Sequence, residues 1–162
     1  MNQSAQLAGF VAAHAMLQVA KGATLGPLII FEKGDGTTHI IRIHEADGQK
    51  AVSQGEEILV ANADGAERGV MAFDAYLNLP QGRTDAIFLQ ARQYAPDSRP
   101  LLMAAPYRRP SKPGGFAVYR PKIFAFEDKP LPEADLVAAF FQGVDRHETG
   151  GAFWRAHTDD SY

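Results

Sequence analysis

Alternating apolar and polar residues between positions 66 and 127 predict four consecutive β-strands. The first two form a hairpin, with strands over 67–79 and 83–94 joined by Pro80-Gln81-Gly82. Because side chains alternate along a strand, the apolar residues of the first strand share one face: Met71, Phe73, Ala75, Leu77 and Leu79. A three-residue loop with Gly at its third position sets Leu79 opposite Arg83 and Phe73 opposite Leu89. We therefore expect both strands to bury the same face.

The remaining strands are predicted on either side of this hairpin. Two later strands cover 99–107 and 115–127, and Pro121 lies inside the second. Because proline has no backbone N–H, that strand is expected at a sheet edge or with a bulge. Earlier in the chain, Gly34-Asp35-Gly36 joins apolar runs at 28–33 and 37–44 into another hairpin.

Apolar residues at helical spacing predict three helices. The first runs from an N-cap at Ser4 to about Lys21. The second covers about 48–62 behind an N-cap at Asp47, and Gly55 is expected to let it approach the sheet closely. The third covers about 133–147 and carries acidic residues at its positive N-terminal end.

The predicted order, α-β-β-α-β-β-β-β-α, indicates an α+β fold with a mainly antiparallel sheet of about six strands and three helices. We expect residues 1–149 to form a single α+β domain, followed by a C-terminal tail over 150–162. Phe153 and Trp154 lie in the tail, so we expect it to dock on the domain rather than anchor a partner. In its order of elements the chain resembles the profilin-like and roadblock-type arrangement. Four consecutive strands also suit a type III secretion chaperone-like sheet.

Composition narrows the class of protein. The 162 residues are 46% apolar and 22% charged, which is typical of a soluble globular chain with one core. There is no cysteine, which excludes thiolate metal sites and cysteine nucleophiles and favours a cytoplasmic location. The apolar run at 7–20 has no Lys or Arg before it, so neither a cleaved signal peptide nor a membrane span is expected.

Catalytic patterns are absent from the sequence. It contains no GxxxxGK[ST] loop, no GxGxxG opening a helix, no nucleophile elbow and no HExxH. His39 and His44 fall on opposite faces of one predicted strand, so they cannot share a metal ion there. We expect no cofactor and no metal, and a binding protein is favoured over an enzyme.

Polar residues of the central hairpin are the first candidate ligand site. Alternation places Asp74, Tyr76, Arg92 and Tyr94 together on one face, where they line a cleft unless a helix covers them. His14 lies on the inner face of the first helix. A satisfied core histidine is the favoured interpretation there, and an acid/base group or ligand is the alternative.

A basic segment is the second candidate site. Six basic residues and no acidic one lie between positions 99 and 126, in a chain of net charge −3. Such a segment suits a phosphate, a carboxylate or an acidic partner, although basic residues also protect exposed sheet edges from pairing. Nucleic acid is not expected as a partner, because the chain is acidic overall. The candidate anion-binding or partner-binding residues are Arg108, Arg109, Lys112, Arg120 and Lys122.

The sequence therefore favours a non-enzymatic binding or adaptor module that acts through a sheet edge or a helix face, as a homodimer. Its other expected partners are an acidic protein or a small anionic ligand. The alternative is a small enzyme or metabolite-binding protein that uses the polar face of the 67–94 hairpin.

Overall fold

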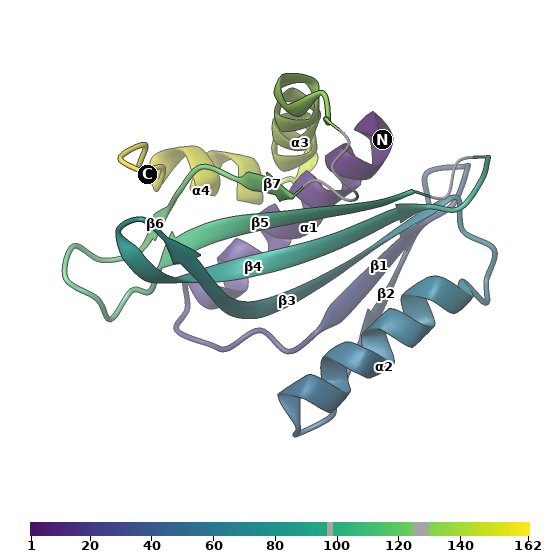
Figure 1. The fold of residues 1–162 in the computed structure, drawn as a ribbon, viewed down its shortest axis with the longest axis horizontal. Helices are drawn as coiled ribbons and strands as arrows, with labels where there is room; N and C mark the ends of the chain where they lie inside the picture. Colours follow the sequence, from purple (N-terminus) through teal and green to yellow (C-terminus); the bar gives the residue numbers. More distant parts are fainter. Residues whose placement is uncertain (97–98, 125–129) are drawn as a thin grey trace.

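The computed structural model describes residues 1–96, 99–124 and 130–162, which form one antiparallel sheet with helices on both faces (Figure 1). The helices in these ranges are α1 (Asn2–Val19), α2 (Gly48–Ala61), α3 (Glu133–Arg146) and α4 (Gly150–Ala156). The strands are β1 (Leu28–Glu32), β2 (Thr38–Arg42), β3 (Arg68–Leu79), β4 (Gly82–Gln93), β5 (Pro100–Arg108), β6 (Ala117–Val118) and β7 (Lys122–Phe124).

The predicted α+β class is confirmed, with two corrections to the element count. The described residues contain four helices rather than three, because the segment after residue 149 folds into α4. They contain seven strands rather than about six, because the last predicted strand is divided into β6 and β7 on either side of Pro121. Both pieces pair with β5, as expected of a strand interrupted by a residue that cannot donate to the ladder. Residues 125–127 of that predicted strand lie outside the described residues.

The sheet has the order β2-β1-β3-β4-β5-β6. Strand β7 also pairs with β5, along the same edge as β6 but farther toward the start of β5. Helix α1 packs against β3, β4 and β5, while α3 and α4 pack against α1 on the same side. Of the helices in the described ranges, only α2 lies on the opposite side, against β1 and β3 (Figure 1). The main core therefore lies between the sheet and α1, and a smaller apolar cluster lies under α2.

Helix α1 is buried around most of its circumference, because the sheet covers one side and α3 covers another. The predicted cap at Ser4 is wrong: the helix begins at Asn2, and Ser4 is buried inside it. The first turn is held by packing and by Gln3, which accepts a hydrogen bond from Arg68 at 2.9 Å. Within the described ranges, no helix combines the length and apolarity needed to cross a bilayer.

Two glycines let α1 and α3 come unusually close. A Cβ atom on Gly9 would collide with the backbone carbonyl of Phe140, and one on Gly143 would collide with the carbonyl of Gln6. Backbone atoms cannot move aside as the end of a flexible side chain can, so any larger residue at either position separates the helices. This contact fixes α3 over α1.

Helix α2 begins after the predicted N-cap Asp47 and ends at Asn62, close to the predicted end. The Asp47 side chain accepts a hydrogen bond from the Lys50 amide at 3.0 Å, and Asn62 ends the helix in the left-handed conformation at φ 44°. The space that a Cβ atom on Gly55 would need is taken by the Met71 side chain of β3. The predicted close approach of this helix to the sheet is confirmed.

The predicted register of the central hairpin is wrong by one residue. Leu79 pairs with Gly82, so Pro80 and Gln81 form a two-residue turn, and Gly82 has a φ of 121° that favours glycine. Phe73 consequently pairs with Phe88 rather than Leu89. A shift of one residue turns the side chains of one strand to the other face relative to its neighbour. Val70 and Ala72 of β3, rather than Met71 and Phe73, face α1.

Candidate functional site

Half of one sheet face carries no helix in the described part of the chain. Helix α2 covers β1 and β3, and the same side of β4, β5 and β7 lies beyond it. Three half-buried phenylalanines cross these strands. Phe73 stacks on Phe88 with ring centroids 5.7 Å apart, and Phe88 stacks on Phe124 at 6.4 Å. We call this surface, formed by Phe73, Phe88, Leu102 and Phe124, the open face.

A groove of about 330 Å³ lies where the open face meets α2. Leu59 and Val60 of α2 form one wall, and β4 and β5 supply the opposite wall with residues that include Gln90, Arg92 and Leu102. Val60 is 58% exposed and stands beside the half-buried apolar residues of the open face. Contiguous exposed apolar surface of this kind marks interaction sites.

Charges of opposite sign border this groove on its two sides. Glu56 of α2 lines the groove and accepts a hydrogen bond from Gln90 at 3.0 Å. Arg92 lies on β4, and Lys122 on β7 pairs with Ala104 on the open-face side of β5. The helix side is therefore acidic and the sheet side is basic.

A second polar cluster lies near the tip of the β3–β4 hairpin, on the α1 side of the sheet. Tyr107 donates to both carboxylate oxygens of Asp74 at 2.9 Å. Arg109 donates to Asp74 at 3.0 Å, and its Nε lies 3.2 Å from Asp85. The Asp74 side chain is only 3% exposed, and this burial raises its pKa despite the donated hydrogen bonds. Burial and the neighbouring carboxylate Asp74 raise the pKa of Tyr107, so that hydroxyl stays a donor.

The predicted shared face of Asp74, Tyr76, Arg92 and Tyr94 is wrong. Asp74 pairs with Ile87 and Tyr76 with Asp85 on the α1 side, while Arg92 lies in the groove on the opposite side. The cause is the one-residue register error in the hairpin. Tyr94 also lies on the α2 side, where its hydroxyl donates to the Leu59 carbonyl and burial raises its pKa to about 12.

The His14 side chain lies close to that of a second histidine, His147. Its ring lies 5.7 Å from that of His147 at the end of α3, and burial is the main cause that lowers its pKa. The His14 Nε2 atom has no hydrogen-bond partner in the described part of the chain. His147 accepts a hydrogen bond from the Gly150 amide at 2.8 Å through Nδ1, which fits a neutral ring. Among the described residues, no three His, Cys, Asp or Glu side chains are placed to share a metal ion.

The five candidate basic residues do not form one surface. Arg108 donates to the Gly115 carbonyl at 2.7 Å and thereby holds its own loop, and Arg109 belongs to the Asp74 cluster. Arg120 lies 3.6 Å from Asp160 in the C-terminal segment. Lys112 lines a small hollow beside Arg109, whereas Lys122 lies on the side of the open face.

The two aromatic residues of the tail have different positions. Trp154 is 1% exposed and packs edge-on against Phe140 and Phe141 of α3. Phe153 is half-buried and contacts Phe116 and His157. Residues after α4 continue to β6, where the Val118 amide donates to the His157 carbonyl at 2.9 Å. In the structure, Trp154 is a core residue.

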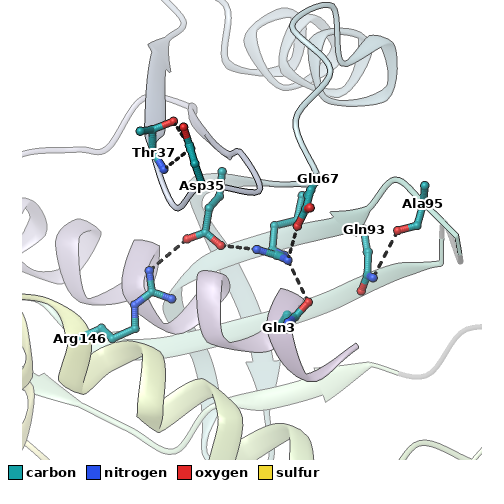
Figure 2. A network of polar contacts seen from close by, with 9 residues as sticks. Gln3, Asp35, Thr37, Glu67, Gln93, Ala95 and Arg146 are labelled. Atoms are coloured by element: carbon teal, nitrogen blue, oxygen red, sulfur yellow. Dashed lines mark hydrogen bonds and ion pairs between the residues drawn. The ribbon is translucent and has the colours of Figure 1, made fainter.

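Sequence reasoning missed a buried ionic network at the other end of the sheet. Arg68 of β3 pairs with Glu32 of β1 and donates to Glu67 and Gln3, each at 2.9 Å. Arg146 of α3 reaches the second oxygen of Glu32 at 3.0 Å. Figure 2 shows Arg146 of α3, Gln3 of α1 and Glu67 of the loop before β3 around this network. The network joins the sheet to the helices, and no local sequence signal pairs residues so far apart.

Comparisons of the chain with family models, with curated proteins and with solved structures found no match.

Proposed function

We propose that this chain is a non-enzymatic, cytoplasmic protein-binding module that pairs with a second copy of itself through the open face. The observation that supports this proposal most is the aromatic ladder of Phe73, Phe88 and Phe124 beside an apolar groove. Interfaces are enriched in aromatic residues at their cores, and a groove beside a protruding apolar side chain suits a complementary surface.

The charges around the groove support a second copy of the chain as the partner. In a two-fold symmetric dimer the same surface meets itself, so every feature must find its complement on that surface. The open face and the neighbouring surface of α2 together carry both members of each pair: Val60 protrudes beside the groove, and Glu56 of α2 lies across from Arg92 and Lys122. A two-fold axis would set α2 of one copy over β5 and β7 of the other. Apolar side chains of the two copies then contact each other, and acidic side chains of one copy face basic side chains of the other.

Sedimentation velocity between about 1 and 100 μM tests this pairing. We expect the native chain to shift from monomer to dimer within this range, and Val60→Glu to remain monomeric, because it buries a carboxylate in the groove. Glutamate is a good helix former, so α2 is expected to keep its fold. Gln81→Glu is the matched control, since it also adds one negative charge, at an exposed turn residue at the end of β4 opposite to the groove residue Arg92. A native chain that stays monomeric at 100 μM contradicts the proposal.

A metabolite-binding role is the second candidate, and one observation favours it. The polar residues first expected to form its site are divided between the two faces of the sheet. A small hollow nevertheless lies next to Asp85, Tyr107 and Arg109. The residues around it suit binding of an anion rather than acid/base catalysis. Asp74, the carboxylate that could act as an acid or base there, is enclosed by Tyr107 and Arg109.

A further inference from the structure

A hollow of about 130 Å³ lies where the β3–β4 hairpin tip meets the loop between β5 and β6. It has room for about four water molecules, at roughly 30 Å³ each. The hairpin tip and the loop lie at the same end of the molecule as the C-terminus (Figure 1). The lining side chains are mostly cationic or hydroxyl-bearing: Arg83, Thr84, Asp85, Tyr107, Arg108, Arg109, Lys112 and Tyr119.

Positive charge exceeds negative charge around this hollow. Four cations line it, and the carboxylates close to them are Asp74, Asp85 and Asp159. Those three carboxylates contact only Arg108 and Arg109 among the four cations. Within the described residues, Arg83 and Lys112 have no carboxylate partner, and the Arg83 guanidinium instead lies 3.7 Å from the centre of the Tyr76 ring. Four cations against three carboxylates leave one net positive charge, and Arg83 and Lys112 are the two cations without a carboxylate partner among the described residues.

Two of the cations around the hollow, Arg108 and Arg109, are held in place before any ligand arrives. Asp74 and Asp85 fix two edges of the Arg109 guanidinium, and its Nη1 makes no hydrogen bond with a described residue. Arg108 donates to the Gly114 and Gly115 carbonyls at 3.2 and 2.7 Å, which shapes the loop that carries Lys112. Both glycines have positive φ, at 92° and 74°, so this loop shape depends on them. Side chains that are already ordered lose less conformational entropy when a ligand binds, which favours binding.

From this arrangement we infer that the hollow binds a small oxyanion, a phosphate or carboxylate group, between the Arg83 and Lys112 side chains with Arg109 Nη1 as a third donor. Guanidinium and ammonium groups form charge-assisted hydrogen bonds with either oxyanion. The site lies on the α1 side of the sheet, so it is independent of dimerisation through the open face. Arg83 lies beside the hairpin turn, where it pairs with Asn78 of β3 in the interior of the strand order.

Titration calorimetry at low and high salt, with inorganic phosphate and with succinate as separate ligands, tests the inference. We expect saturable one-site binding of at least one ligand at low salt, weakened at high salt because ions screen the contact. Arg83→Gln/Lys112→Gln is expected to weaken binding roughly tenfold or more, since it removes two charged donors. Single Lys112→Gln changes only an exposed loop residue and is expected to weaken binding at least threefold.

Lys21→Gln/Lys33→Gln is the control, because it removes two positive charges from exposed residues that line neither the hollow nor the groove. It is expected to keep native affinity within about twofold. Thermal unfolding of each variant shows whether the fold is intact. The inference is overturned if neither ligand gives saturable heat with the native chain, or if the control variant loses as much affinity as Lys112→Gln. Repeating the titration with the Val60→Glu variant separates this result from the dimer proposal.

Discussion

Replacement of Arg68 by methionine tests the ionic network that joins the sheet to the helices. Arg68 is 11% exposed and its partner Glu32 is 7% exposed, so the pair is almost fully shielded from water. Methionine refills most of the apolar volume of the arginine stem, and the change mainly removes a charge and its hydrogen bonds. Glu32 is then left as a buried carboxylate with Arg146 as its remaining cation.

The expected cost follows from this burial. Removing one member of a buried ion pair costs about 3–5 kcal/mol, because the other charge stays buried without compensation. Arg146 still reaches one oxygen of Glu32, but its side chain is 46% exposed and neutralises the carboxylate less well. We therefore expect Arg68→Met to lower the free energy of unfolding by about 3 kcal/mol, a large part of the roughly 5–15 kcal/mol typical of a whole domain.

Urea unfolding followed by circular dichroism measures this change. Arg155→Met is the control, because Arg155 makes three hydrogen bonds to Asp145 of 2.8–3.1 Å with both side chains largely exposed. We expect the control to lie within the error of the assay, since water screens that pair. A loss below about 1 kcal/mol for Arg68→Met would show that shielding from water does not determine the strength of this network.

Three further outcomes are expected. Gly143→Ala should destabilise the fold by at least about 2 kcal/mol because it separates α1 from α3, whereas Gly48→Ala in α2, where no atom stands in the way, should be neutral or stabilising. The pKa values of His14 and His147 are lowered in the fold, so stability should fall as pH drops below about 6.5, and His14→Gln should flatten this dependence in thermal melts. Fluorescence of Trp154, the single tryptophan, should shift to the red in the same transition as circular dichroism; an earlier shift would show that the C-terminal segment unfolds separately.

The order of strands and helices could be predicted because each element carries its own local pattern. Asp47 and Gly55 define α2, and Pro121 marks the break in the last strand. The hairpin register could not be predicted in the same way. Pro80 and Gly82 fit either a two-residue or a three-residue loop, and both faces of β3 are apolar near its start, so alternation did not distinguish them.

The first candidate site, on the central hairpin, depended on that register. Once it shifts by one residue, Asp74 and Arg92 lie on opposite sides of the sheet, and the expected polar cleft divides into two separate surfaces. Arg83 was not singled out, because only the folded hairpin brings it to the loop that carries Lys112. The pair of Glu32 and Arg68 is likewise a product of tertiary structure, since 36 residues separate them in the chain.

Charge reversal across the proposed dimer tests the central claim most directly. In a two-fold dimer each substitution occurs twice, so Glu56→Lys and Lys122→Glu should each place two like-charge contacts in the interface. Sedimentation equilibrium should show a dissociation constant raised roughly tenfold or more for each single variant, and near-native affinity for the double variant, in which the charges are exchanged. Single variants that dimerise like the native chain, or a double variant no better than the singles, would contradict pairing through the open face.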